Sequence, residues 1–299
     1  MLATLVASPF NSPGWVYEEK YDGVRILAYK EGKDVTLLSR NGIDRSHDYA
    51  AIASALKELR PRTLLLDGEV VAFDRSGVSR FQMLQQGNSA LHYAVFDLLY
   101  RDGRDLRREP LSERRTMLEQ TVRGGDELLI SRRLDTNGLK AYAIAKKKGY
   151  EGLVAKDSAS PYVSGRSRFW LKVKVHQEDE FVVVGYTAPT GARKHFGALL
   201  LGAHQGEKLL FVGKVGTGFS GSTLAALFRK FQPLRQKTVP VQNPPRERDV
   251  TYLKPRLVAQ IAYEEWTADQ KLRQPVFLGL RDDKAAKDVV IDRPTRRRK

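Results

Sequence analysis

Short runs of hydrophobic and β-branched residues, separated by polar turns, recur through the first part of the chain. Runs of about four to eight such residues are typical of β-strands. They predict strands at Val24–Tyr29, Val35–Ser39, Thr63–Phe73, His92–Leu98 and Phe169–Val175. Apolar residues at helical spacing predict helices at Tyr49–Arg60, from Ser112 to Val122 and at Leu139–Lys148. We therefore expect residues 1–176 to form an α+β domain built around antiparallel sheets.

The pattern changes after the acidic segment His176–Glu180, where short apolar runs with scattered glycines begin. Successive short strands with tight turns are typical of a small barrel. The predicted strands are Phe181–Tyr186, Gly197–Ala203, Leu209–Val215, Leu257–Tyr263 and Val276–Leu280, with a helix at Leu224–Phe231 and a proline-rich crossing at Pro240–Pro245. We expect a second domain over residues 177–299, and a disordered basic tail at Arg296–Lys299.

The net charge of the chain indicates which class of molecule it binds. The 299 residues include 51 Lys and Arg against 35 Asp and Glu, a formal net charge of +16. Such an excess favours a polyanion, because neutralising phosphates releases condensed counterions. Nucleic acid is the leading candidate, although a solvated basic surface would give the same count.

Other classes are excluded by what the chain lacks. No apolar run approaches the roughly 18 residues that a membrane-spanning helix needs, and the N-terminal segment does not read as a secretory signal. We therefore expect a cytoplasmic protein. With no cysteine, disulfides, zinc-thiolate sites and thiol catalysis are excluded, which leaves oxygen ligands for a metal such as Mg²⁺ or Mn²⁺. The first domain has no glycine-rich phosphate loop, so a nucleotide there would be held by side chains.

Six polar segments stand out in the first domain. A lone KxDG is weak, because it is common by chance, but here it is followed by other segments placed near predicted strands. In order they are Glu18-Glu19-Lys20-Tyr21-Asp22-Gly23-Val24-Arg25, Ser39-Arg40-Asn41-Gly42, Leu66-Asp67-Gly68-Glu69, Phe96-Asp97, Glu151–Lys156 and Trp170–Lys174.

In this order the segments resemble the nucleotidyltransferase motifs of ATP-dependent DNA ligases, whose superfamily also includes RNA ligases and mRNA capping enzymes. The resemblance continues in the second domain, at Phe196–Gly202, Gly213–Phe219 and Arg273–Lys284. This combination is similar to the ligase module of bacterial ligases of non-homologous end joining. It implies an adenylation domain at residues 1–176 and an OB-fold barrel at residues 177–299.

The resemblance implies that Lys20 is the catalytic nucleophile, which takes AMP from ATP as a phosphoramide. Only a neutral amine can attack phosphorus, and free lysine is protonated at neutral pH. The pKa of Lys20 must therefore be lowered, or its proton removed on binding. Cationic neighbours and a metal disfavour the ammonium form, and the resemblance places Lys172, Lys174 and Mg²⁺ nearby. Alternation along the strand puts Lys172 and Lys174 on one face, where they would neutralise phosphate charge.

Further roles follow from the resemblance. Phe96 would stack on the adenine and Glu18 would accept from its amino group, which favours ATP over GTP. Arg25 and Glu69 match ribose-contacting positions, and Arg40 matches a position that contacts phosphates. Glu151 and Glu69 would supply oxygen ligands to the metal.

In the second domain, Arg273, Asp283 and Lys284 match a motif that closes over ATP and orients the pyrophosphate, with Arg281 as a further cation. His176–Glu180 would be the hinge of that motion. We expect loops and a helix between Lys214 and Lys230 to hold DNA. Lys156 and Arg166 are weaker candidates for a contact to phosphate or the DNA backbone. Trp170 is expected to pack structurally.

These assignments predict an enzyme of three steps: adenylation of Lys20, transfer of AMP to the 5′-phosphate of a nick or break in duplex DNA, and displacement of AMP by the 3′-hydroxyl. The resemblance implies a monomer associated with the bacterial nucleoid, with a Ku-like end-binding protein and polymerase or phosphoesterase modules as partners in trans. Two alternatives stay open: an RNA ligase or GTP-using capping enzyme, and a catalytically silent nucleic-acid-binding protein on the same scaffold.

Overall fold

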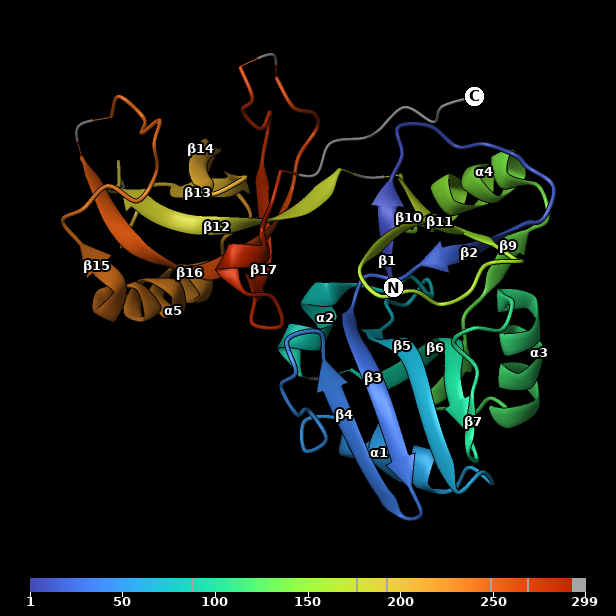
Figure 1. Ribbon diagram of the computed structural model, residues 1–299. Coiled ribbons are helices and arrows are strands. Elements are labelled where there is room, and N and C mark those ends of the chain that lie inside the picture. The colour runs from blue at the N-terminus through green and yellow to red at the C-terminus, as the bar shows by residue number, and fades with distance from the viewer. Residues whose placement is uncertain (88, 176, 192, 248, 268, 292–299) are drawn as a thin grey trace. The chain divides into compact units, whose positions relative to one another are not determined.

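The computed structural model describes residues 1–87, 89–175, 177–191, 193–247, 249–267 and 269–291. These residues form two compact units, the first at Met1–Val175 and the second within residues 177–291 (Figure 1). No helix among them is long and apolar enough to cross a membrane. The basic tail Arg296–Lys299 lies outside the described residues.

The first unit contains two sheets. Sheet 1 has the strand order β1-β11-β10-β2-β9, formed by Leu2–Leu5, Arg166–Lys174, Gly152–Asp157, Trp15–Lys20 and Arg133–Asp135. Sheet 2 has the order β4-β3-β5-β6-β7, with β8 also paired to β6; its strands are Asp34–Ser39, Val24–Glu31, Thr63–Ala72, Leu91–Arg101, Arg104–Asp105 and Leu128–Ile130.

Each sheet contains one parallel pair of strands, so the expectation of antiparallel sheets is wrong at these two pairs. The pair β1–β11 is parallel in sheet 1, and β6–β8 is parallel in sheet 2. In each parallel pair a long stretch of chain separates the two strands, as a parallel arrangement requires. The first unit is therefore a mixed α+β fold.

The helices of the first unit pack against these sheets. Val24, Ile26 and Ala28 alternate along β3 and are buried, and they share a core with residues of the first helix such as Ile52 and Leu56. The helices are α1 at Ala50–Lys57, α2 at Phe81–Gln86, α3 at Leu111–Thr121 and α4 at Gly138–Lys148. The sequence pattern predicted α1, α3 and α4 within a few residues and missed the short α2.

The second unit is built on one antiparallel sheet with the strand order β14-β13-β12-β16-β15 and β17 paired to β16. Its elements are β12 (Glu178–Thr187), β13 (Leu199–Gln205), β14 (Lys208–Val215), α5 (Gly221–Phe231), η1 (Gln232–Leu234), β15 (Arg235–Gln236), β16 (Val250–Ala262), β17 (Val276–Arg281) and η2 (Ala286–Asp288). Helix α5 begins at a Ser220 cap, whose hydroxyl accepts from the Thr223 amide. It buries Leu224, Leu227 and Phe231 in the hydrophobic core of the second unit.

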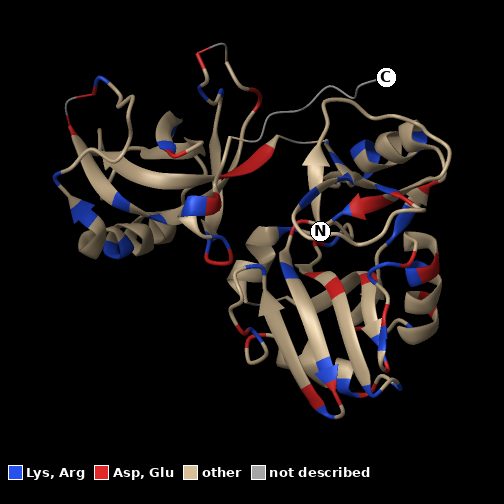
Figure 2. Ribbon diagram, viewed as in Figure 1, with Lys and Arg blue, Asp and Glu red and all other residues tan. Residues whose placement is uncertain are grey.

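The predicted hinge overlaps the start of β12. Glu178, Asp179 and Glu180 pair with β16 and belong to the strand, so they are part of the second unit's sheet. Acidic residues colour this strand start red in Figure 2, while Lys and Arg colour parts of α4 and α5 blue. His176 lies outside the described residues.

Candidate functional site

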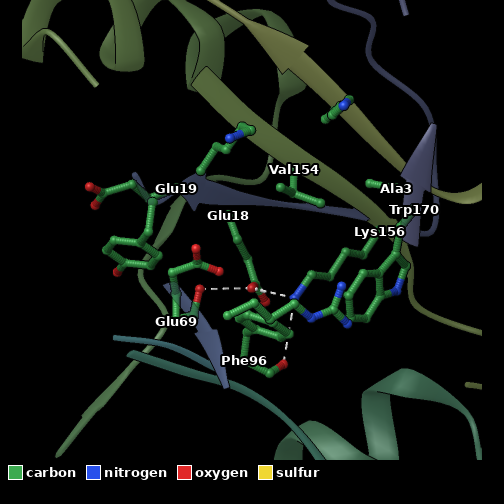
Figure 3. Close-up of a pocket in the computed structure, with 13 residues that line it drawn as sticks. Ala3, Glu18, Glu19, Glu69, Phe96, Val154, Lys156 and Trp170 are labelled. Atoms are coloured by element: carbon green, nitrogen blue, oxygen red, sulfur yellow. Dashed lines mark hydrogen bonds and ion pairs between the residues drawn. The ribbon is translucent and has the colours of Figure 1, made fainter. Parts of the chain in front are cut away.

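A pocket opens between the two sheets of the first unit. Sheet 1 contributes residues of β1, β2, β10 and β11, and sheet 2 contributes residues of β3, β5 and β6. Its lining residues are Ala3, Glu18, Glu19, Lys20, Tyr21, Arg25, Glu69, Phe96, Ser131, Val154, Lys156, Trp170 and Lys172 (Figure 3). Eight of the residues singled out in the sequence are thus brought together: Glu18, Lys20, Arg25, Glu69, Phe96, Lys156, Trp170 and Lys172.

The turn after Lys20 explains the Asp-Gly pair that follows it. Asp22 accepts from the Phe81 amide at the start of α2, 3.0 Å away, and its own amide donates to Ser79 Oγ. A Cβ at Gly23 would lie 2.2 Å from the Val70 carbonyl oxygen of β5. Only glycine therefore allows β3 to start so close to β5. The turn holds Lys20, the last residue of β2, at the edge of the pocket.

Lys20 forms an ion pair with the carboxylate of Glu151, next to β10. Burial and the nearby Lys174 lower the pKa of Lys20, but the attraction of Glu151 and Asp22 is stronger, and the resulting pKa lies above its ordinary value. Of the two possibilities that the sequence left open, a lowered pKa is not found in this arrangement, and removal of the proton on binding stays a prediction. Lys174 lowers the pKa of Lys20 as expected, but the Glu151 carboxylate, which contacts the ammonium, raises it by more.

Glu18 is buried and held by three side chains. Arg115 Nη1 donates to Oε1 at 3.0 Å, while Ser131 Oγ and Lys156 Nζ donate to Oε2 at 2.9 and 2.7 Å. Two cations beside one buried carboxylate compensate the cost of removing it from water. The neighbouring Glu19 points away from Glu18 in Figure 3, as alternation along β2 requires.

Arg25 lies across the sheet from Glu69, to which it is paired in the β3–β5 register. Its guanidinium is bound in a bidentate manner by Asp67, with Nε–Oδ1 2.9 Å and Nη2–Oδ2 2.6 Å. Tyr162 donates its hydroxyl hydrogen to Asp67 Oδ2 at 2.8 Å. This bracing fixes the direction of Arg25 within the pocket.

Aromatic rings form one wall of the pocket. Phe96 and Trp170 meet edge to face, with centroids 5.7 Å apart. The Lys156 ammonium lies 4.8 Å from the Phe96 centroid and 4.4 Å from that of Trp170. Trp170 packs as expected and is buried, but it also lines the pocket.

Lys172 and Lys174 alternate with buried Leu171 and Val173 on β11, as the sequence predicted. Lys172 lines the pocket, and the charge of Lys174 is close enough to lower the pKa of Lys20. Both residues are paired with β10, Lys172 with Val154 and Lys174 with Gly152.

Several predicted residues lie elsewhere. Arg40 is exposed just after β4, and Arg166 is exposed and donates to the Ala3 carbonyl at 2.9 Å. Lys156, expected to contact phosphate or the DNA backbone, is 2% exposed and lines the pocket.

The motif residues Arg273, Asp283 and Lys284 belong to the second unit. Arg273 is largely exposed and pairs with Glu265 at 2.8 Å. Asp283 is buried and forms a bidentate pair with Arg281, both contacts 2.8 Å, while Lys284 pairs with Glu180 at 2.9 Å.

The candidate metal ligands are two carboxylates. No group of three or more His, Cys, Asp or Glu that could hold a metal occurs in the part of the chain that the structure describes. Glu69 lines the pocket and Glu151 contacts Lys20. Two hard oxygen donors suit Mg²⁺, which keeps several waters and takes substrate phosphate oxygens as its remaining ligands.

Sequence reasoning named Trp170 only as a packing residue and Lys156 only as a contact to phosphate or the DNA backbone, although a signal that both line the pocket was present. Trp170 is two residues before Lys172 on the same strand, and Lys156 is two residues after Val154, so strict alternation places both on the pocket face. Arg115 and Ser131 come from segments with no motif, and nothing in the sequence connects them to Glu18.

Two sheets that meet at a pocket with a lysine, flanking lysines, carboxylates and an aromatic ring define a covalent nucleotidyltransferase class. Family models agree with this class: the ATP dependent DNA ligase domain matches residues 1–174, and the ATP dependent DNA ligase C terminal region matches residues 192–284. The chain belongs to the ATP-dependent DNA ligase family.

Its relatives include multifunctional non-homologous end joining proteins LigD. The Pseudomonas aeruginosa protein is 39% identical over 98% of this chain and 36% of its own length, and the Mycobacterium tuberculosis protein is 38% identical over 97% and 39%. A solved structure of mycobacterial DNA ligase D complexed with ATP and MES matches with TM-score 0.68 and 34% identity, covering 97% of this chain and 98% of that chain. The chain thus spans little more than a third of the length of these curated relatives.

Proposed function

We propose that this chain is an ATP-dependent DNA ligase that seals breaks with a 5′-phosphate and a 3′-hydroxyl, in DNA repair by end joining. Lys20 carries the AMP and passes it to the 5′-phosphate, from which the 3′-hydroxyl displaces it. The observation that carries this proposal is Lys20 itself, which ends a strand in the pocket and contacts the carboxylate of Glu151. Membership of the ligase family and the relatives named LigD support the substrate.

In the first step, Lys20 Nζ forms a bond to the α-phosphorus of ATP while the bond to pyrophosphate breaks. The ammonium proton must leave before attack, because Nζ needs a free lone pair. Glu151 pairs with the protonated Lys20 until the nucleotide arrives, and the proton is then released to solvent. Lys172 and Lys174 neutralise charge that develops on the phosphate. Glu18 and Phe96 bind the adenine, Arg25 and Glu69 contact the ribose, and Arg40 contacts phosphates of the nucleotide or DNA.

A divalent cation completes this site in our proposal. Glu69 and Glu151 would hold Mg²⁺ or Mn²⁺ together with phosphate oxygens. When bound, the cation supplies charge neutralisation at the reacting phosphate. The oxygen-only chemistry of these two donors supports that choice of metal.

The second unit serves as an OB-fold domain in this proposal. Its antiparallel sheet of short strands, with α5 between β14 and β15, supports the assignment. Arg273, Asp283 and Lys284 orient the pyrophosphate during adenylation, and residues between Lys214 and Lys230 contact DNA. A Ku-like end-binding protein and separate polymerase or phosphoesterase modules are the expected partners.

The test combines labelled ATP with a matched pair of lysine variants. Wild type, Lys20→Ala and the exposed-lysine control Lys33→Ala, each first treated with pyrophosphate, are incubated with α-labelled ATP and Mg²⁺ and run on a denaturing gel. We expect label on wild type and Lys33→Ala but not on Lys20→Ala, and transfer of the label when nicked DNA is added, with sealed product. Parallel reactions use α-labelled GTP and nicked RNA. Label that is transferred to RNA but not to DNA would favour an RNA ligase, and label from GTP but not from ATP would favour a capping enzyme. No label from either nucleotide would favour a silent binding protein.

A further inference from the structure

Lys20 and Glu151 both lie at the ends of regular elements. Lys20 is the last residue of β2, and Glu151 belongs to the short connection between α4 and β10. The β2–β10 pairing ends with Gly152, which is opposite Lys20. The ion pair between Lys20 and Glu151 therefore forms where the pairing of these two strands stops, and further contacts between the two segments bear on its geometry.

Arg132 joins these two segments through its side chain. It lies between β8 and β9, and its Nη1 is 3.2 Å from Glu19 Oε2 and also donates to the Tyr150 hydroxyl. Glu19 is the residue before Lys20, and Tyr150 is the residue before Glu151. The guanidinium also lies against the Tyr150 ring, with Cζ 5.7 Å from the ring centroid. One side chain thus contacts the chain neighbours of both members of the ion pair.

The backbone of Arg132 is bound on both sides of Lys20. Its amide donates to the Tyr21 hydroxyl at 3.1 Å, and its carbonyl accepts from the Glu19 amide at 2.9 Å. Tyr21 and Glu19 are both buried. Arg132 is therefore anchored to the end of β2 through its backbone, and its side chain extends that anchoring to Tyr150.

The Glu19 carboxylate is suited to hold the guanidinium in place. Its side chain is completely buried, and neither oxygen has a hydrogen-bond partner among the described residues. When ionised, such a carboxylate depends on a nearby cation to compensate its charge, and Arg132 supplies one. The attraction draws the side chain of Arg132, which is half exposed, toward the buried end of β2.

We propose that Arg132 is a positioning residue for the adenylation of Lys20: its guanidinium ties the end of β2 to the segment before β10 and so keeps Lys20 Nζ and the Glu151 carboxylate in fixed relation. The inference rests on the proposed function, because the group that is positioned is the proposed nucleophile. Among the described residues, Arg132 is not one that lines the pocket, so it acts through its neighbours and not on the nucleotide. A misplacement of about 1 Å can lower the rate of attack about 100-fold.

The experiment measures single-turnover adenylation of Lys20 at increasing ATP concentration, after treatment with pyrophosphate, in wild type and Arg132→Met. We expect the maximal rate to fall about 10–100-fold. The ATP concentration for half-maximal rate should stay within about twofold of wild type, because residues expected to bind the nucleotide have other partners. Such partners are Arg115 for Glu18 and Asp67 for Arg25. Arg132→Lys, which keeps a positive charge beside Glu19, should recover part of the rate.

A second variant tests the contact with Tyr150 directly. Tyr150→Phe removes only the hydroxyl that accepts from Arg132, so it should fold as wild type does and lower the maximal rate in the same way. The double variant should be no slower than Arg132→Met alone, because the hydroxyl then has no guanidinium to hold.

Arg133→Met is the matched control. The side chain of Arg133 is 49% exposed against 50% for Arg132, and it pairs with Glu119 of α3 at 3.8 Å. This variant should keep the wild-type rate. An equal loss in Arg133→Met would overturn the inference, since the charge of the segment and not the position of Arg132 would then matter.

A purely structural role of Arg132 predicts lower stability with a wild-type maximal rate in the folded protein. That rate in Arg132→Met, or independent effects of the Arg132 and Tyr150 substitutions that multiply in the double variant, would overturn the inference and leave the proposed function intact. Where Arg132→Met does not fold, Tyr150→Phe decides, and a wild-type rate in that variant would overturn the inference. Absence of label on wild type with ATP would overturn the proposed function itself.

Discussion

Arg114 and Asp97 form a bidentate ion pair whose two side chains are completely buried, with Nε–Oδ1 and Nη2–Oδ2 both 2.8 Å. Asp97 follows Phe96 on β6, and Arg114 lies on α3, so the pair ties that helix to the strand that carries the pocket ring. Arg114 also donates to the carbonyls of Glu109 and Ser160. The pair thus connects three parts of the first unit at one buried point.

Replacing Asp97 with Asn should destabilise the first unit strongly. The substitution leaves the Arg114 guanidinium buried without a compensating charge, which costs about 3–5 kcal/mol. Urea unfolding of the variant measures the change in free energy. Asp105→Asn is the matched control, because its pair with Arg107 is about half exposed and solvent screening leaves it little effect on stability. Equal effects of the two substitutions would show that burial of the pair does not matter.

Lys172→Met should slow Lys20 adenylation by about 100–1000-fold with little change in stability. The side chain lines the pocket from β11, and removing one preorganised positive partner of a developing charge has a cost of this size. Single-turnover labelling with ATP in the absence of DNA measures the rate. Arg168→Met, an exposed cation on the same strand, should keep the wild-type rate. A similar loss in both variants would point to general charge and not to position.

Much of this architecture could be predicted from local pattern, because period-two alternation follows directly from strand geometry. It correctly placed β3 and β11, and with them the pocket-facing Lys172. The parallel pairing of β1 with β11 could not be predicted that way, since it joins Leu2–Leu5 to residues more than 160 positions later. The hydrophobic pattern of a segment does not indicate which distant strand it pairs with.

In the site, too, residue types could be predicted from the sequence, whereas their contacts could not. The motifs identified residues by type, and the structure brings Glu18, Lys20 and Glu69 into one pocket. The direction of the pKa shift of Lys20 could not be predicted, because the pKa depends on which charge is in contact. The sequence does not reveal that the Glu151 carboxylate contacts Lys20 Nζ. Contacts of this kind are tertiary properties.

Stability should fall between mildly acidic and mildly alkaline pH because of Glu19. Burial raises the pKa of Glu19 to about 7 from an ordinary 4.5, although Arg132, 3.2 Å away, lowers it. Neither carboxylate oxygen has a hydrogen-bond partner among the described residues. The folded state therefore keeps this proton where the unfolded chain releases it. The resulting stabilisation is complete below pH 4.5 and is lost as the pH rises through 7.

Comparison with Glu19→Gln isolates this effect. The difference in unfolding free energy between wild type and variant should change by about 3 kcal/mol from pH 4.5 to pH 8, to the disadvantage of wild type. Denaturant unfolding at several pH values provides the measurement. Glu207→Gln, an exposed glutamate between β13 and β14, should run parallel to wild type throughout. Parallel curves for Glu19→Gln as well would mean that Glu19 is ionised in the folded protein at all these pH values.

Removal of divalent cations should abolish Lys20 labelling, and Mg²⁺ or Mn²⁺ should restore it. Glu69→Gln should raise the Mg²⁺ concentration for half-maximal labelling by about 10–100-fold, because it replaces a charged oxygen ligand with a neutral one. The measurement is a metal titration after treatment with EDTA. Glu113→Gln, on the first turn of α3, serves as the control and should leave the titration unchanged. Full labelling in EDTA would contradict the assignment of Glu69 and Glu151 as metal ligands.

Two arginines of the second unit should separate a role in catalysis from a role in stability. Arg273 has an exposed side chain whose pair with Glu265 contributes little, so Arg273→Ala should leave the unfolding free energy within about 1 kcal/mol of wild type. It should nevertheless slow adenylation about 100-fold, since it removes a cation proposed to orient pyrophosphate. Joining of DNA that already carries a 5′-adenylate releases no pyrophosphate and should proceed at the wild-type rate.

Arg281→Met should behave in the opposite way. Arg281 and Asp283 are each only 9% exposed, and their bidentate pair is joined by Gln260, whose Oε1 accepts from Arg281 at 2.9 Å. Loss of the guanidinium removes the bidentate partner of a buried carboxylate, which should cost about 3 kcal/mol in unfolding free energy. The measurements are the unfolding curves of Arg273→Ala and Arg281→Met and the rate at which Arg273→Ala joins adenylated DNA. Together they decide which arginine acts in catalysis and which in stability. If that joining slows as much as adenylation does, Arg273 acts on DNA and not on the leaving group.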